Sequence, residues 1–161
     1  MKKAAFYTLG CKVNQYETEA MTELFENSGY QTVDFDEKAD VYVINTCTVT
    51  GLSARKSRQA IRRAKSVNAD AIVAVVGCYP QTAPEEVEGI EGVDIMIGTK
   101  DRLRILDYIT AYEASGARVR AVGDIMRDRG FEALKIDRYK DRTRAFLKIQ
   151  DGCSQFCAYC I

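Results

Sequence analysis

Short apolar runs alternate along the chain with longer mixed stretches that carry helix start and stop signals. The runs have the length and the β-branched and aromatic content of buried strands. We therefore expect strands at residues 4–9, 30–33, 41–44, 71–76 and 93–97. Helices are expected at residues 14–27, 53–65 and 101–114, with a shorter one that begins at Pro84.

The order of these elements predicts an α/β fold. Strands separated by helices form right-handed β-α-β units, and such units build a mostly parallel sheet. We expect a five-stranded flavodoxin-like sheet of strand order 2-1-3-4-5, flanked by helices and contained in residues 1–116. Asn14 and Glu17, three residues apart, form a capping-box pattern that predicts Asn14 as the cap of the first helix.

The character of the chain changes beyond Gly116. Residues 117–142 are rich in basic residues and have little helical periodicity, which is typical of a connecting segment, with a β-hairpin as one option. Residues 143–149 have a strand pattern that runs directly into a cysteine-rich loop, as the first strand of a β/α barrel does. Such a barrel needs about 250 residues. We therefore interpret residues 143–161 as the truncated start of a barrel domain.

The composition limits the available chemistry to cysteine. The chain has 161 residues, 23 basic and 23 acidic, and no apolar run long enough to span a bilayer, so we expect a cytoplasmic protein without membrane contact. Histidine is absent, which excludes Cys-His zinc sites and histidine-activated nucleophiles. Glycine-rich phosphate loops are absent too. In a reducing compartment, the six cysteines favour metal or cluster binding over disulfides.

Three of the cysteines lie on one short loop near the end of the chain. Cys153, Cys157 and Cys160 have C-x3-C-x2-C spacing, which provides thiolates for three irons of a cubane cluster and leaves the fourth iron open. An open iron is what S-adenosylmethionine needs as a chelation site before its reductive cleavage. Half of a zinc ribbon, or a pair of surface disulfides, is the alternative interpretation.

The other three cysteines each follow a predicted strand. Cys11 follows the first strand, Cys47 the third and Cys78 the fourth. Because the carboxyl ends of parallel strands share one edge of a sheet, we expect the three side chains to converge there. Three thiolates without histidine suit a cubane cluster better than zinc, which would lack a fourth protein ligand. The alternative is three ordinary half-buried core cysteines.

The cysteines and their flanking residues together resemble the radical S-adenosylmethionine methylthiotransferases in order and spacing. The resemblance covers the whole chain and rests on Gly10–Glu19, Asn45–Cys47, Gly77–Tyr79 and Gly152–Ile161. Within that family, Thr46–Thr50 and Ala54–Arg63 look most like the branch that acts on threonylcarbamoyladenosine in tRNA. The isopentenyladenosine branch and the ribosomal-protein branch remain alternatives. A non-catalytic nucleic-acid-binding module with structural cysteine–metal sites is the alternative from another class.

The resemblance implies an enzyme with two [4Fe-4S] clusters that adds a methylthio group at carbon 2 of a modified adenosine beside the anticodon. Cys11, Cys47 and Cys78 would hold an auxiliary cluster, and Cys153, Cys157 and Cys160 the radical-generating cluster. S-adenosylmethionine, tRNA and an electron donor are the implied cofactor and partners, while the oligomeric state stays open. Phe156 and Tyr159 are expected either to contact S-adenosylmethionine or to pack within the loop. Without the barrel, the chain is expected to be inactive by itself.

Charged residues also cluster along the sequence. The helix expected at 53–65 carries six basic residues and no acid, and four of these basic residues fall on one helical face: Arg55, Arg58, Arg62 and Lys65. Such a stripe suits tRNA phosphates, although a solvated helix face is the alternative. Two acidic clusters, at residues 17–26 and 85–91, are expected to be solvent faces without a role.

Overall fold

The protein was examined as a computed structural model that describes residues 1–48, 51–125, 127, 130–134, 136, 146, 148–150, 152–153 and 157–158. Its strands are β1 (Lys3–Thr8), β2 (Gln31–Val33), β3 (Val41–Thr46), β4 (Ile72–Gly77), β5 (Ile95–Ile97) and β6 (Val119–Ala121). Its helices are α1 (Lys12–Asn27), α2 (Gly51–Val67), α3 (Cys78–Thr82), α4 (Pro84–Glu88), the 3-10 helix η1 (Arg102–Arg104) and α5 (Ile105–Ser115).

The strands form one sheet of order β2-β1-β3-β4-β5-β6, and every pair in it is parallel. This confirms the expected 2-1-3-4-5 order. The central strands β3 and β4 are buried along their whole length, which explains their continuous apolar runs, because both faces of a parallel sheet are covered by helices.

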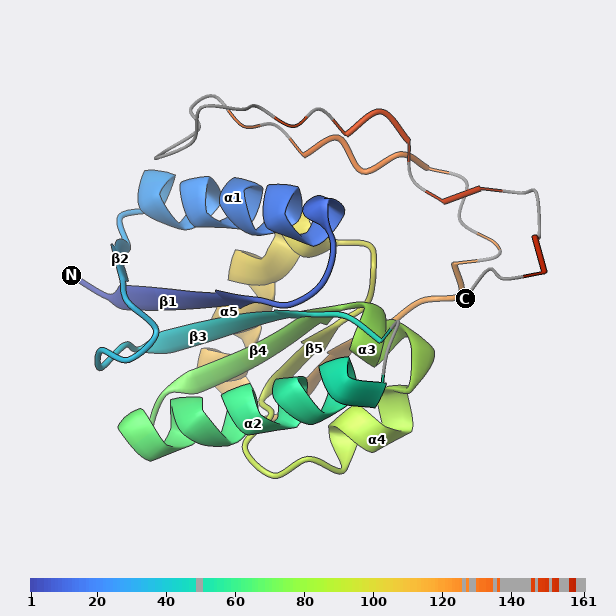
Figure 1. The fold of residues 1–161 in the computed structure, drawn as a ribbon. Helices are drawn as coiled ribbons and strands as arrows, with labels where there is room; N and C mark the ends of the chain where they lie inside the picture. The colour runs from blue at the N-terminus through green and yellow to red at the C-terminus, as the bar shows by residue number, and fades with distance from the viewer. Residues whose placement is uncertain are drawn as a thin grey trace.

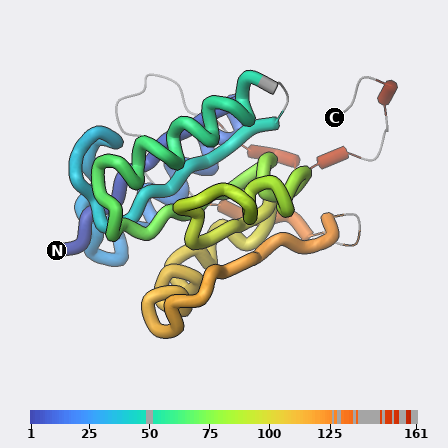
Figure 2. Tube along the Cα trace, turned by 90° about the horizontal axis from the view of Figure 1, so that it is seen from below, coloured from blue at the N-terminus to red at the C-terminus, as the bar shows by residue number. Residues whose placement is uncertain are grey.

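Helices cover both faces of the sheet (Figures 1 and 2), and an apolar cluster lies on each face. On one face, Met21 and Phe25 of α1 and Ile105 and Ile109 of α5 pack on the sheet. On the other, the core includes side chains of α2, α3 and α4: Ala60, Ile61, Ala64, Tyr79 and Val87. The helices and the sheet thus form a three-layer α/β structure. Within the described part of the chain, no helix is long and apolar enough to cross a membrane.

The prediction of five strands is wrong, because β6 adds a sixth. It pairs in parallel with β5 and belongs to the stretch that the sequence indicated as a connecting segment with an optional hairpin. The strand has three residues, and its middle one is the exposed Arg120, so the apolar signal is weak. Arg120 instead pairs with Glu85, at 3.1 Å, and with Glu88, at 2.9 Å. A charged residue on a short edge strand also discourages the strand from pairing with strands of other molecules.

The predicted barrel strand at residues 143–149 lies mostly outside the described residues. Those of its positions that are described, Phe146, Lys148 and Ile149, are not in a strand. The boundaries at 116 and 142 that separate the expected domains stay a prediction, although β6 shows that the sheet itself extends beyond residue 116.

Asp94 connects both helical layers at the amino end of β5. Its Oδ2 accepts hydrogen bonds from Lys65 Nζ of α2 and from the backbone N–H of Val73, each at 2.9 Å. Its Oδ1 accepts one from Tyr112 Oη of α5, at 2.8 Å, and this hydrogen bond raises the pKa of Tyr112. One carboxylate therefore joins α2, β4 and α5.

We expect Asp94→Asn to lower the free energy of unfolding by about 2 kcal/mol, because an amide has one acceptor oxygen and cannot accept on both sides, from Lys65 and Val73 and from Tyr112, and the charge assistance is lost. Urea unfolding followed by circular dichroism measures the effect. Glu91→Gln, an exposed substitution in the same turn, is the control and should leave stability unchanged. Equal stabilities of the two variants would contradict the assigned role of Asp94.

Candidate functional site

Three of the cysteines follow three neighbouring strands at one edge of the sheet. Cys11 is the N-cap residue of α1 after β1, Cys47 directly follows β3, and Cys78 is the first residue of α3 after β4. Because β1, β3 and β4 are adjacent and parallel, their carboxyl ends lie side by side. The expected placement of the three residues at the carboxyl edge of one sheet is confirmed.

Glycines before two of these cysteines allow the strand ends to approach each other closely. Gly10 has φ +108°, and a Cβ atom on it would lie 2.6 Å from Cys47 Cβ and 3.1 Å from Cys47 Sγ. Gly77 has φ +97°, and a Cβ there would lie 2.7 Å from Asn45 Oδ1 and 2.9 Å from the Thr46 carbonyl oxygen. Both the backbone conformation and the available space therefore require glycine.

The three thiols differ in exposure. Cys11 is exposed, Cys78 is half-buried and Cys47 is only 5% exposed. Burial is the main reason that the pKa of the Cys78 thiol is raised, and the neighbouring Cys47, Glu17 and Cys11 act in the same direction. Both other thiols are thus close enough to act electrostatically on Cys78. A bound metal would oppose this effect, since it stabilises the thiolate form of its ligands.

A buried amide pair holds the cysteine-bearing loops together. Asn14 Nδ2 donates to the backbone oxygens of Leu9, at 2.8 Å, and of Thr46, at 2.9 Å. Asn45 Nδ2 donates to the Asn14 backbone oxygen, at 3.0 Å. The Cys11 thiol is also 3.3 Å from Asn14 Oδ1, within hydrogen-bond range for sulfur. Each amide is at most 3% exposed, so these bonds offset a desolvation cost that would otherwise be large.

The prediction of Asn14 as a helix cap is wrong. The helix begins at Lys12, Cys11 is its N-cap, and no side chain caps it. Asn14 faces the sheet edge instead, because two backbone oxygens from neighbouring loops need a donor there. Asn45 has a signal in the sequence: an amide that continues the apolar run 41–44 of a buried strand is costly to bury unless it is hydrogen-bonded.

Two further residues, Thr46 and Tyr79, fix the backbone next to Cys78. Thr46 Oγ1 donates to the Val76 oxygen, at 2.6 Å, and accepts from the Tyr79 backbone N–H, at 3.3 Å. Tyr79 is 2% exposed. Its hydroxyl accepts from Arg58 Nη1, at 2.9 Å, and donates to Glu86 Oε2, at 3.1 Å. The residue after Cys78 is therefore held at both its backbone and its side chain.

We call the carboxyl edge of the sheet with Cys11, Cys47 and Cys78 the cysteine edge. Its three thiols are suitable ligands for an iron–sulfur cluster, although they do not form a preformed site for a single ion. Among the residues that the structure describes, no three Cys, Asp or Glu side chains are arranged to hold a single metal ion. A cubane cluster gives each cysteine its own iron, so its ligands stand farther apart than those of one ion. Three thiols on one edge, one of them exposed, are compatible with that larger group.

The second cysteine set is only partly described. Cys153 and Cys157 are exposed. Cys160, Phe156 and Tyr159 lie outside the described residues. The expectation that the three cysteines form one cluster site, and that the two aromatic residues contact S-adenosylmethionine or pack in the loop, stays a prediction.

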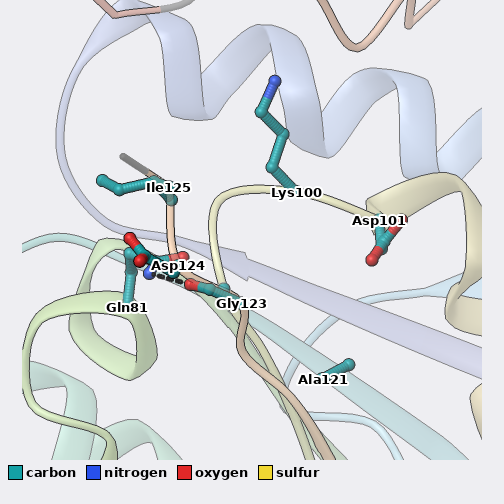
Figure 3. Close-up of a pocket in the computed structure, with 8 residues that line it drawn as sticks. Gln81, Lys100, Asp101, Ala121, Gly123, Asp124 and Ile125 are labelled. Atoms are coloured by element: carbon teal, nitrogen blue, oxygen red, sulfur yellow. Dashed lines mark hydrogen bonds between the residues drawn. The ribbon is translucent and has the colours of Figure 1, made fainter. Parts of the chain in front are cut away.

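A small pocket lies beside α3 (Figure 3). Gln81 crosses it, donating to the Gly123 oxygen at 2.9 Å and accepting from the Thr99 backbone N–H at 3.0 Å. Lys100 and Asp124 line it as well. Its volume is about 80 Å³, whereas pockets for drug-sized ligands have about 300–1,000 Å³. It is too small to hold a nucleoside cofactor.

The sequence matches the family described as "Uncharacterized protein family UPF0004" over residues 3–98. This match covers β1 to β5 and the Cys11, Cys47 and Cys78 positions. The chain belongs to this family.

Named relatives extend the similarity to the full chain. Threonylcarbamoyladenosine tRNA methylthiotransferase MtaB of Bacillus subtilis (strain 168) is 53% identical over 161 residues, which is 100% of this chain and 36% of that protein. The Aquifex aeolicus (strain VF5) protein of the same name is 41% identical, over 99% of this chain and 39% of that protein. The chain thus spans little more than a third of these relatives. The resemblance to methylthiotransferases that its cysteine motifs indicated is confirmed.

A relative of a different name is more distant. The tRNA-2-methylthio-N(6)-dimethylallyladenosine synthase of Clostridium tetani (strain Massachusetts / E88) is 31% identical, over 99% of this chain and 37% of that protein. Among solved structures, the isolated REC domain of RcsB from Salmonella enterica serovar Typhimurium has a TM-score of 0.50 and 11% identity, covering 74% of this chain and 92% of that domain. At that identity, the likeness supports the doubly wound α/β fold alone.

We expect Gly10→Ala to destabilise the fold more than Gly29→Ala. Both glycines have positive φ, but a Cβ at Gly29 would meet nothing within 4 Å, whereas one at Gly10 would collide with Cys47. Gly29→Ala should therefore cost roughly 1 kcal/mol of backbone strain, and Gly10→Ala about 1–3 kcal/mol more, with displacement of the Cys47 loop. Thermal unfolding of the two variants tests this. Equal losses would mean that the strand ends are not tightly packed here.

Proposed function

We propose that the chain is the N-terminal part of a tRNA methylthiotransferase that adds a methylthio group at carbon 2 of a threonylcarbamoyl-modified adenosine next to the anticodon. The observation that carries the proposal is the set of three cysteines at one sheet edge, in a chain that is 53% identical over its whole length to a protein named for this reaction. The 31% identity to a dimethylallyladenosine synthase makes the isopentenyl-type adenosine the second candidate substrate.

We infer two cluster sites. Cys11, Cys47 and Cys78 would hold an auxiliary [4Fe-4S] cluster, and Cys153, Cys157 and Cys160 a second [4Fe-4S] cluster with one iron left for S-adenosylmethionine. When bound, these groups supply the sulfur and the radical chemistry of the reaction. The part of the chain that the structure describes has no histidine and no three-residue ion site, which leaves thiolates as the natural ligands.

The residues around the three cysteines would determine how the auxiliary cluster is oriented. Asn14 and Asn45 hold the loops that carry Cys11 and Cys47 at a fixed separation. Cys47 is buried, so water has little access to its side of the cluster. Cys11 is exposed and lies on the open side, where a partner domain and a nucleic acid would approach.

A basic face on α2 supports tRNA as the partner. Arg55, Lys56 and Arg62 are exposed. Two other basic residues of this helix have structural partners instead: Arg58 bonds to Tyr79 and Lys65 pairs with Asp94 at 2.9 Å. Arg62, together with the accessible parts of Arg58 and Lys65, lines a groove that is closed on its other side by residues 89–92. Phosphates fit such a face without sequence specificity.

The cluster assignment predicts the iron content of variants. In the full-length protein, replacing Cys11, Cys47 and Cys78 with alanine should remove about half of the iron and acid-labile sulfide but leave reductive cleavage of S-adenosylmethionine, because each triad holds its own cluster. Replacing Cys153, Cys157 and Cys160 should abolish the cleavage. Anaerobic reconstitution with iron counting and a deoxyadenosine assay measures both. If the first variant keeps its second cluster but loses all cleavage, the division of roles is wrong.

The basic face predicts salt-dependent binding of tRNA. Arg55→Gln with Arg62→Gln should weaken binding to all tRNA sequences alike and reduce the slope of log Kd against log salt by about one to two, since each lost phosphate contact releases about one counterion less. Fluorescence anisotropy over a salt series measures the slope. Arg104→Gln, at an exposed cation near the start of α5, is the control. An unchanged slope would favour the solvated-helix interpretation.

A further inference from the structure

A buried charge network lies beside the cysteine edge and includes, among the residues that the structure describes, Glu17, Arg102, Glu132 and Lys148. The side chains of Glu17, Arg102 and Lys148 are 3% exposed, and that of Glu132 is 9% exposed. The expectation that Glu17 belongs to a solvent face is therefore wrong. Charges this deeply buried are costly unless they are paired, so their arrangement needs an explanation.

The network alternates in sign along its contacts. Glu17 Oε2 lies 3.2 Å from Arg102 Nη2, and Glu17 Oε1 lies 3.4 Å from Lys148 Nζ. Arg102 Nη1 contacts Glu132 Oε2 at 2.9 Å, and the Arg102 backbone N–H donates to Glu132 Oε1 at 2.7 Å. Each carboxylate oxygen of Glu17 thus faces a different cation.

The four residues come from two parts of the chain. Glu17 lies on α1 and Arg102 in η1, both within the α/β structure, whereas Glu132 and Lys148 belong to the segment beyond β6. Part of that segment runs alongside α1 (Figure 1). The network therefore fastens the later segment to the α/β structure. Apolar residues of the same volume often give equal or greater stability at such places, which favours a role in positioning over one in stability.

Other contacts of α1 hold the same segment. Tyr16 Oη donates to the Leu134 backbone oxygen, at 2.5 Å, and the two residues share a small apolar cluster that Phe146 also contacts. Lys12 Nζ lies 5.7 Å from the centre of the Phe146 ring. Lys12, Tyr16 and Glu17 all lie within the first two turns of the helix whose N-cap is Cys11. The segment is thus docked on the cysteine-bearing end of α1.

The network is also close to the first cysteine set. The charges of Glu17 and Arg102 act on the Cys78 thiol, in opposite directions. Lys148 precedes Cys153 by five positions in the sequence. One ion pair, Glu17–Lys148, therefore links the helix that begins at the first cysteine set to the segment that leads to the second.

We propose that Glu17 is a positioning residue that fixes the two cysteine sets relative to each other, with α1 as their common support. The proposal rests on the proposed function, in which both sets hold clusters that act on one substrate. Loss of the Glu17 charge should free the segment around Lys148 and misalign the two sites while leaving each site itself intact.

Two measurements on Glu17→Gln test the proposal. In the 161-residue chain, hydrogen exchange of peptides that cover residues 130–150 should become faster, while exchange in β3 and β4 stays unchanged. In the reconstituted full-length enzyme, iron content and S-adenosylmethionine cleavage should be retained, but methylthio transfer per cleavage should fall about tenfold or more, since a misplacement of about 1 Å can cost about 100-fold. Glu113→Gln, which removes the charge from the exposed Lys2–Glu113 pair at 2.5 Å, is the matched control. It should change neither the hydrogen exchange of residues 130–150 nor methylthio transfer per cleavage.

Loss of cleavage and transfer in equal proportion, or unchanged exchange at residues 130–150, would overturn the proposal. If Glu17→Gln does not fold, Glu17→Gln combined with Lys148→Met removes both charges of the pair and should lower methylthio transfer per cleavage in the same way. An unchanged ratio of transfer to cleavage in that double variant would overturn the proposal as well. Failure of the proposed function is distinct, because it would appear as absent methylthio transfer in the unaltered enzyme, whereas the exchange measurement needs no activity.

Discussion

The side-by-side parallel pairing of β1, β3 and β4 is the constraint on which the cysteine site depends. Parallel strands point the same way, so the residues that follow them must share one edge of the sheet. Cys11, Cys47 and Cys78 are far apart in the sequence and neighbours in space for this reason alone. The conformations of Gly10 and Gly77 and the bonds of Asn14 refine a placement that the pairing already determines.

Helix α1 combines two kinds of buried polar contact. In its first turn, Asn14 makes neutral hydrogen bonds that hold the loops of the first cysteine set. Glu17, three positions further on, makes ion pairs with Arg102 and Lys148. The two residues are thus nearly one turn apart on the same helix. The helix therefore joins the cysteine edge to the segment that continues towards Cys153.

The sequence was sufficient for the strand order and for the edge on which three cysteines lie, because both follow from local patterns and from the handedness of β-α-β units. It was insufficient for β6, whose three residues carry a charge in the middle. The roles of Asn14 and Glu17 were missed for a different reason. Their partners Thr46 and Lys148 are 32 and 131 residues away, and no pattern local to α1 indicates them. Capping and solvent-face rules describe a helix in isolation, and tertiary contacts overrode them here.

Asp94 gives the two ends of the sheet different mechanical properties. It braces α2, β4 and α5 at the amino end of β5, opposite the edge where the cysteines lie. Of the cysteine-bearing loops at the carboxyl edge, the one after Cys47 leads to α2, whose far end is anchored to Asp94 through Lys65. A displacement of the Cys47 loop would therefore reach a helix whose other end is held in place, so that the layered core would keep its packing.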